Sequence, residues 1–476
     1  MTTNLRSSDG EMFSVPNNLL QKSETLASML NVCSDDTDDT DDTVTLDRIN
    51  SKYLRIIIPW LQSGSVQSDN LELNDLYYLL VHSNYLNIPD LLNQLCELLI
   101  DKIAKRNNLH KIDSDLITEP RCFNSNCKTS TRGALKVCAK CSIARYCCKD
   151  CQSSDWAHHK TMCKRISTFT KTMNKEAAHL SVELWGEPGN TFEEEAGHFW
   201  GIHETRAYCR ARHCLAETIL ELADGKQQSF IYEKGLAHHM ELLRLIHGDN
   251  MGIRYEVPSV FLKLNRDEDC YNFLKWWSTI DPHGRYDWGD PPESREGDWL
   301  YLRDQDLLEN PLKFIDRMEL QVLAAFLWIR LRIVSRYSLM EAIENEIKSA
   351  TCKSEELRFL PHILPTVKKM LLGRYRSKSS LKAQEEILRQ ILEAIEMCNK
   401  TFLPAMINPG PLLSCPAPSV YSDGSSSEAY LAVKQSLGML SSVSVAKDII
   451  TKFCGGNTYY KVDMESVGRF AVRTNP

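Results

Sequence analysis

The sequence predicts a multidomain, mainly α-helical protein, in which a small α/β domain and a cysteine-rich segment precede a large helical region. The chain has 476 residues, which is more than one hydrophobic core usually holds. Strand patterns occur near the N-terminus, whereas helical patterns dominate the C-terminal three hundred residues. Between them, cysteines recur at ordered spacing. We therefore expect a domain at 1–105, a linker at 106–121, a cysteine-rich module at 122–163 and a helical domain at 165–476.

The first hundred residues combine short strands with helices. Asp9-Gly10 is a two-residue turn signal, which predicts a β-hairpin over residues 5–15. Ser23 can cap a helix that follows it. Further elements are expected as a strand at 44–46 and helices at 49–62 and 76–103, the last one broken at Ile88-Pro89. The Asp/Thr run at 34–43 is interpreted as a solvated insertion.

Four stretches of this region lie in a recognisable order, namely "LRSSDGEMF" (5–13), the acidic run, "IIPWL" (57–61) and "SNYLNIPDLL" (83–92). Over residues 4 to about 105 the chain resembles the Skp family of cullin–RING ubiquitin-ligase adaptors. The resemblance implies a BTB/POZ-type fold, and it implies that Asn84 and Tyr85 face a cullin. The alternative is packing at a helix end, with Asn84 capping a turn and Tyr85 in the core.

Skp adaptors continue into C-terminal helices that hold the F-box of a substrate receptor. Residues 104–121 are polar here and lack an amphipathic pattern, so F-box binding is not expected.

Seven cysteines and one histidine form four pairs at ordered spacing: Cys122-x4-Cys127, Cys138-x2-Cys141, Cys147-x3-Cys151 and His159-x3-Cys163. Eight such side chains suffice for two four-coordinate sites, and zinc prefers thiolate-rich tetrahedral sets. Because protein ligands would fill every position, we expect structural rather than catalytic sites.

This segment has two adjacent pairs of like residues, Cys147-Cys148 and His158-His159, and helical periodicity indicates which member of each pair is a ligand. His159 lies four residues before Cys163 and shares a helix face with it, whereas His158 is turned by about 100°. The same spacing relates Cys147 to Cys151 and leaves Cys148 offset. The sequence therefore predicts Cys147 and His159 as ligands.

The strings "YC…CQ" (146–152) and "DW..HK..C" (155–163) make residues 122–163 resemble the MYND zinc finger. The resemblance implies two structural zinc ions with interleaved ligand sets: Cys122, Cys127, Cys147 and Cys151 for one, and Cys138, Cys141, His159 and Cys163 for the other. It also implies that Gln152 and Trp156 line a groove for proline-containing peptides. Alternatively, Trp156 packs its helix onto the zinc core.

The region after residue 165 reads as helices with short breaks. Helical patterns cover 230–250, 256–277 with a turn at Asn265-Arg266, 310–334, 354–373 and 382–399, while 408–428 reads as a loop. The helix pairs resemble tetratricopeptide-like hairpins, which implies a protein-binding scaffold. The acidic, aromatic stretch 280–299 is interpreted as a loop docked by its tryptophans. His238-His239 and Cys209/Cys214 are interpreted as helix residues rather than metal ligands.

Composition indicates in which cellular compartment the protein is expected and which classes of partner are not expected. The chain has 17 cysteines and no apolar leader pattern at its start, and its longest apolar run, 322–329, is too short to span a membrane. We therefore expect an intracellular protein, cytoplasmic or nuclear, with no membrane partner. Residues 121–164 hold nine Lys/Arg and two Asp, but no helix face combines them with base-reading side chains, so nucleic acid is not an expected partner.

The sequence lacks the "NHSC"-like cofactor motif of SET methyltransferases, and it lacks GxSxG, GxxxxGK[ST] and HExxH. The first hypothesis is a non-enzymatic, zinc-binding adaptor for protein interactions, linked to a cullin-based ubiquitin ligase. The alternatives are a MYND/POZ scaffold of a transcriptional or chromatin complex and a cryptic enzyme such as a methyltransferase.

Overall fold

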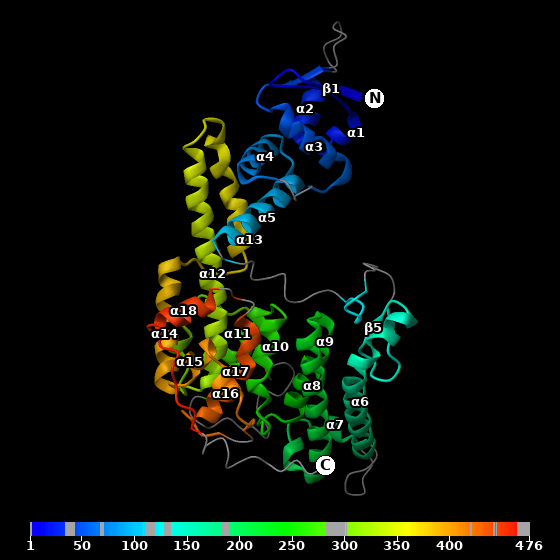
Figure 1. The fold of residues 1–476 in the computed structure, drawn as a ribbon, viewed down its shortest axis with the longest axis vertical. Coiled ribbons are helices and arrows are strands. Elements are labelled where there is room, and N and C mark those ends of the chain that lie inside the picture. The colour runs from blue at the N-terminus through cyan, green and yellow to red at the C-terminus, as the bar shows by residue number, and fades with distance from the viewer. Residues whose placement is uncertain are drawn as a thin grey trace. The chain divides into compact units, whose positions relative to one another are not determined.

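The structure is a computed structural model (Figure 1), and the residues that it describes are 2–33, 43–66, 71–107, 109, 120–127, 135–181, 190–281, 300, 302–418, 421–440, 443 and 445–463. Among these residues it has 18 α-helices and five strands, so the predicted mainly helical fold class is confirmed. Most of the predicted acidic insertion and most of the 280–299 loop lie outside the described residues. None of the helices in the described ranges is long and apolar enough to cross a membrane.

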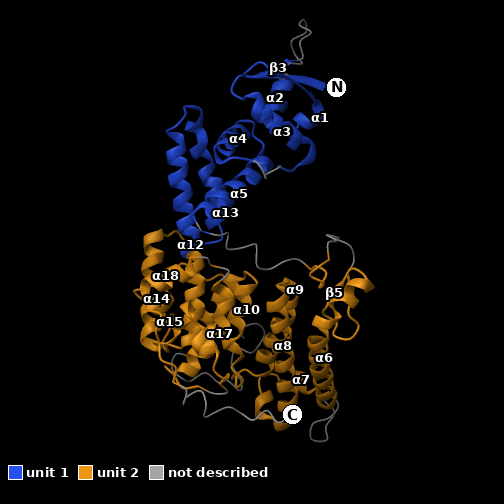
Figure 2. Cartoon of the chain, in the orientation of Figure 1, with its two compact units in different colours: residues 1–111, 334–376 blue, residues 112–333, 377–476 orange. Residues whose placement is uncertain are grey.

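The chain forms two compact units (Figure 2). The N-terminal unit contains residues 1–111 and 334–376, and the helical unit contains residues 112–333 and 377–476. This division differs from the predicted one, because residues 334–376 were expected to belong to the helical domain.

A three-stranded sheet opens the N-terminal unit. Strands β1 (Thr2–Ser7) and β2 (Met12–Pro16) form the predicted antiparallel hairpin, and β3 (Thr43–Leu46) pairs with β1 in parallel, which gives the order β2-β1-β3. Gly10 has φ +85°, which the turn requires and which glycine adopts without strain. Leu5 and Val15 point into the core from the two hairpin strands.

Helices follow where the sequence predicts them: α1 (Asn17–Leu20), α2 (Glu24–Cys33), α3 (Ser51–Ser63), α4 (Leu73–Tyr85) and α5 (Pro89–Arg106). The Ser23 hydroxyl accepts a hydrogen bond from the amide of Leu26 at 3.1 Å, so Ser23 caps the start of α2. The break between α4 and α5 falls at Ile88-Pro89, because proline at the first helical position needs no amide partner.

The same unit includes the second half of α12 (Leu320–Thr351), the 3-10 helix η5 (Glu356–Ile363) and α13 (Leu364–Leu372). Here η5 packs on α4, and α13 packs on α5. Ile343, Leu360 and Val367 belong to the same buried cluster as Leu76 and Leu91. A segment more than two hundred residues away in sequence therefore completes the core of the N-terminal domain.

The helical unit is built around α8 (Arg206–Lys226), α9 (Ser229–Leu245) and the first half of α12. Its further helices among the described residues are α6 (Lys149–Leu180), α7 (Thr191–Glu194), α10 (Val257–Lys263), α11 (Asp267–Thr279), α14 (Leu381–Cys398), α15 (Phe402–Ile407), α16 (Gly410–Leu413), α17 (Ser426–Leu440) and α18 (Ala446–Phe453). The predicted turn at Asn265-Arg266 separates α10 from α11, whereas the stretch predicted as a loop at 408–428 contains α16 and the start of α17.

Two arginines that interrupt the apolar run of α12 are buried in the helical unit. Arg332 donates to Asp267 at 2.5 Å and to the carbonyl of Leu262 at 2.7 Å, and Arg330 donates to Gln384. Buried charges need such partners, so these arginines tie α12 to neighbouring segments.

Truncation of Ile343 tests whether the distant segment supports the N-terminal core. Ile343→Ala should lower the free energy of unfolding of this unit by about 2–5 kcal/mol, because Ile343 is fully buried and a cavity would remain. Hydrogen exchange of the α4 and α5 amides should then accelerate. Glu344→Ala, at the next and exposed position, is the control. Equal exchange in the two variants would contradict the shared core.

Candidate metal centre

The finger, residues 122–163, is built on a two-stranded ribbon and the start of a long helix. Strands β4 (Lys136–Val137) and β5 (Arg145–Tyr146) pair in antiparallel fashion. Between them the amide of Cys138 donates to the carbonyl of Ala144 at 2.8 Å, and the amide of Ser142 donates to the carbonyl of Cys138 at 2.9 Å. This tight turn presents the side chains of Cys138 and Cys141 on one side.

The structure brings the eight predicted ligands together in the two predicted groups of four. Within each group the ligand atoms lie within 4.8 Å of one another. The first group contains Cys122, Cys127, Cys147 and Cys151, and the second contains Cys138, Cys141, His159 and Cys163. The groups alternate along the chain, which is the interleaved arrangement that the resemblance implied.

The distances between these atoms fit tetrahedral zinc. Zn–S bonds of about 2.3 Å and Zn–N bonds of about 2.0–2.1 Å place two sulfurs about 3.8 Å apart, and a sulfur and a nitrogen about 3.6 Å apart. The Sγ atoms of Cys127 and Cys147 are 3.6 Å apart, and those of Cys138 and Cys163 are 3.8 Å apart. Cys141 Sγ lies 3.5 Å from His159 Nε2. All are far beyond the disulfide length of about 2.05 Å.

In each adjacent pair the structure places the predicted residue, Cys147 or His159, in a ligand group and leaves its neighbour outside. For the cysteine pair the reason differs from the predicted one. Helix α6 begins at Lys149, so Cys147 does not share a helix face with Cys151 as predicted; it reaches the first group from the end of β5. Cys148 is the N-cap, and its Sγ accepts a hydrogen bond from the amide of Cys151 at 3.4 Å. His159 is buried and His158 is exposed, as helical periodicity predicts.

Aromatic side chains surround the ligand His159. Its ring is 6.5 Å from that of Phe123, 6.1 Å from that of Tyr146 and 6.2 Å from that of Trp156. Burial lowers the pKa of His159, which favours the neutral imidazole that binds a metal. The Tyr146 hydroxyl donates to Asp155 Oδ2 at 2.7 Å, and this buried bond fixes β5 against α6.

The finger is continuous with the helical unit. Helix α6 runs without a break to Leu180 and packs along α8, so the predicted boundary at residues 163–165 falls inside one helix. At the C-terminal end of α8, Lys226 Nζ donates to the carbonyl of Phe123 at 2.8 Å and lies 3.6 Å from Asp155 Oδ1. The Arg145 guanidinium lies 4.0 Å from the Phe230 ring centroid. Sequence reasoning missed these contacts, because α8 and α9 are remote from the ligand motif.

The predicted peptide-binding residues lie on the first turns of α6. Gln152 and Trp156 are one helical turn apart and therefore share a face. The Trp156 side chain is 41% exposed while its ring still contacts His159, so it serves packing and remains accessible.

The predicted cullin-facing residues, Asn84 and Tyr85, end α4 in the N-terminal unit and are exposed. The alternative that Tyr85 sits in the core does not match its 37% exposure. Both side chains line an open groove of about 680 Å³, called here the α4 groove, whose lining residues are Asp47, Arg48, Val81, His82, Asn84, Tyr85, Ser354, Glu355, Glu356, Arg358, Phe359 and His362. No sequence signal linked residues 354–362 to this surface.

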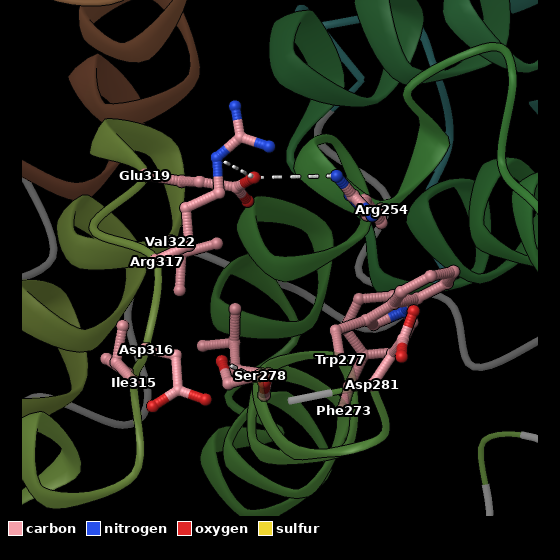
Figure 3. A pocket seen from close by; sticks show the side chains of 11 residues that line it. Arg254, Phe273, Trp277, Ser278, Asp281, Ile315, Asp316, Arg317, Glu319 and Val322 are labelled. Atoms are coloured by element: carbon pink, nitrogen blue, oxygen red, sulfur yellow. Dashed lines mark hydrogen bonds and ion pairs between the residues drawn. The ribbon is translucent and has the colours of Figure 1, made fainter. Parts of the chain in front are cut away.

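A smaller cavity of about 240 Å³ lies in the helical unit (Figure 3). Arg254 and Glu319 lie across it, with Arg254 Nη2 3.6 Å from Glu319 Oε1, and Arg317 Nε is 3.6 Å from the same oxygen. The Arg254 guanidinium also lies 5.2 Å from the Trp277 ring centroid. Arg254 and Arg317 thus share one carboxylate, and ion pairs within the helical unit account for the charged groups that line the cavity.

Comparison with known proteins identifies both N-terminal modules. Residues 1–65 match the family profile described as "Skp1 family, tetramerisation domain", and residues 122–163 match "MYND finger". The chain therefore carries a Skp1-type POZ domain and a zinc-binding MYND finger, both of which are protein-interaction modules.

Curated relatives match over short stretches. They are "SET domain and MYND-type zinc finger protein 6" of Schizosaccharomyces pombe, 38% identical over 13% of this chain, "SET domain-containing protein 14" of Caenorhabditis elegans, 40% identical over 26%, and a "SET and MYND domain-containing protein" of Dictyostelium discoideum, 34% identical over 12%. The matched stretches cover 12%, 28% and 10% of those proteins, so the chain spans less than a third of each relative.

Matched substitutions within the two adjacent pairs, Cys147/Cys148 and His158/His159, test the ligand assignment. Cys147→Ser and His159→Gln should each lower the zinc content of the purified chain, since each removes a ligand atom from a group of four. Cys148→Ser and His158→Gln should retain the full zinc content, because serine also caps a helix and His158 is exposed. Metal analysis after dialysis measures this. Equal zinc loss from Cys148→Ser would show that Cys148 is a ligand.

Proposed function

We propose that the chain is a non-enzymatic adaptor that connects a bound protein to a cullin-based ubiquitin ligase. The exposed end of α4, in the unit whose residues 1–65 match the Skp1 family profile, is the observation that carries the proposal. The MYND finger would hold two structural zinc ions, one in each group of four ligands, with no coordination position left open. The 17 cysteines suit a reducing compartment inside the cell.

The α4 groove has the chemistry of a protein-docking surface. Tyr85 is exposed, and the Arg48 guanidinium lies 5.8 Å from its ring centroid. Tyrosine and arginine are enriched among the residues that dominate binding energy in interfaces. Val81 and Phe359 supply apolar surface in the same groove. Burial lowers the pKa of the adjacent His82 to about 4, so this side chain is neutral at physiological pH.

The finger would supply the second docking surface. An exposed indole is a common anchor for proline-containing peptides, and Trp156 presents one beside Gln152. Because α6 continues into the helical unit, a peptide on this face would be held by a scaffold rather than by a free module.

The segment 334–376 accounts for the absence of an F-box-binding pattern after the POZ domain. It packs its own apolar side chains on α4 and α5, so a part of this chain covers these two helices. We infer that the helical unit and finger replace a separate substrate receptor.

A double substitution tests the cullin surface. Asn84→Ala/Tyr85→Ala should weaken binding of a purified cullin N-terminal domain at least tenfold, which corresponds to about 1.4 kcal/mol, because it removes an exposed aromatic anchor. Titration calorimetry with the full chain measures the affinity.

Asn93→Ala, an exposed asparagine of α5, is the matched control and should bind as the wild type does. Absence of wild-type binding at micromolar concentration, or equal binding by the double variant, would refute the cullin link.

Truncation of Trp156 tests the peptide surface. Trp156→Ala should abolish binding of proline-containing peptides and leave the zinc content unchanged, since the indole is exposed and supplies no ligand atom. His158→Ala, exposed on the same helix, should leave both unchanged. Fluorescence anisotropy with a labelled peptide library measures binding. Retained affinity in the tryptophan variant would leave packing as the role of Trp156.

A methyltransferase is the second candidate, because the relatives are named for SET domains. The matched stretches cover at most 26% of this chain, and the sequence lacks an "NHSC"-like cofactor motif, so we rank it below the adaptor. Thermal stabilisation by S-adenosylmethionine would reverse this ranking.

A further inference from the structure

A cluster of two histidines and two glutamates lies in the helical unit outside the finger. Helix α8 supplies His213 and Glu217, α9 supplies His239, and Glu256 is the residue that precedes α10. One nitrogen or oxygen from each of these side chains lies within 4.8 Å of those of the other three. From the sequence alone, His239 is expected to be a helix residue and not a metal ligand.

The distances in the cluster match the edges of a coordination tetrahedron. Zn–N and Zn–O bonds of about 2.0–2.2 Å place a ligand nitrogen and a ligand oxygen about 3.4 Å apart. His213 Nε2 lies 3.2 Å and His239 Nε2 also 3.2 Å from Glu256 Oε2, and His239 Nε2 lies 3.6 Å from Glu217 Oε1. One carboxylate oxygen thus faces both imidazoles, and one imidazole faces both carboxylates.

His239 provides an independent indication of a ligand. Its side chain is 0% exposed, and among the described residues neither of its ring nitrogens makes a hydrogen bond. Nε2 is near two carboxylates, yet its N–H direction meets neither oxygen as a hydrogen bond requires. A buried imidazole nitrogen that lies 3.2 Å and 3.6 Å from two carboxylate oxygens, and makes a hydrogen bond to neither, is placed as a metal ligand would be.

The surrounding backbone holds the four side chains in position. Glu217 follows His213 by one helical turn, so both face α9 from one side of α8. Gly235 allows the two helices to approach closely, because a Cβ there would lie 2.5 Å from Leu220 Cδ2. Helices α8 and α9 accordingly pack side by side (Figure 1).

The Glu256 side chain is oriented by a turn that Asp249 stabilises with hydrogen bonds. Asp249 accepts hydrogen bonds from the amides of Ile253 at 2.8 Å and Arg254 at 3.0 Å, and these fix the 3-10 helix η3 (Ile253–Tyr255). Glu256 follows directly, so its carboxylate is directed by a turn that is itself anchored.

We propose that His213, Glu217, His239 and Glu256 bind one divalent first-row transition-metal ion, with zinc as the first candidate. Two ionised carboxylates balance the double charge of the ion, and two imidazoles favour such metals over magnesium and calcium. Four protein ligands leave no open position, so the ion acts as a structural clamp that joins α8, α9 and the start of α10.

Metal analysis of the full chain tests the proposal, with cobalt as a spectroscopic probe. Cobalt bound to cysteine thiolates shows sulfur-to-metal charge-transfer absorption, whereas cobalt at a His/Glu site shows only d–d bands. The wild type should bind one divalent ion more than its finger holds. Glu217→Gln and His239→Gln should lose that one ion and keep the charge-transfer absorption.

The variants are chosen so that folding cannot obscure the result. The Glu217 side chain is 45% exposed, so Glu217→Gln removes a ligand charge with little change in packing. His238→Gln, one residue away on α9 and outside the cluster, is the matched control and should retain the additional ion. The proposal is overturned if Glu217→Gln and His238→Gln bind the same number of ions as the wild type.

Discussion

The ligands that α6 contributes to the finger are the contacts on which the attachment of the finger to the helical unit depends. A finger of this length buries little apolar surface by itself, so metal ligation supplies most of its folding free energy. His159 and Cys163 close the second group of ligands, and the helix that carries them continues to Leu180 along α8. The zinc-binding residues therefore fix the position of a helix that belongs to the scaffold. The Lys226 contacts with Phe123 and Asp155 attach the finger to the C-terminal end of α8, in addition to the continuous helix α6.

The N-terminal unit shows how a domain can be completed by residues far away in the sequence. Helices α4 and α5 of this unit follow the stretch that matches the Skp1 family profile, and their apolar side chains need a covering segment. Residues 334–376 return to cover them, and their buried side chains join one continuous core with those of the sheet and helices. The return is possible because α12 extends over 32 residues and contributes its two halves to different cores. One consequence is that the α4 groove is formed by two remote stretches, 47–85 and 354–362.

Local signals were predictable from the sequence, and remote associations were not. The hairpin at Asp9-Gly10 and the break at Ile88-Pro89 follow from backbone restrictions of single residues, and the structure confirms both. The spacing of the finger cysteines also identified the side chains that come together. Periodicity shows which face of a helix is apolar but not which core covers it, so the packing of residues 334–376 was not foreseen. For the same reason the sequence did not indicate that His239 lies in a ligand cluster, because its neighbours Glu217 and Glu256 come from other segments.

The finger and the His/Glu cluster place metal ligands at different points of the scaffold that α6, α8 and α9 form, with His213 and Glu217 in the middle of α8. Trp156 lies one turn before His159, and their rings are 6.2 Å apart, so the orientation of the exposed indole is set by the helix that the second ligand group fixes. Loss of that group would release the first turns of α6, and Gln152 and Trp156 would no longer share a defined face. The peptide surface is thus coupled to ligation through a single rigid helix. A change in partner affinity on metal removal would then reflect loss of orientation, because neither Gln152 nor Trp156 supplies a ligand atom.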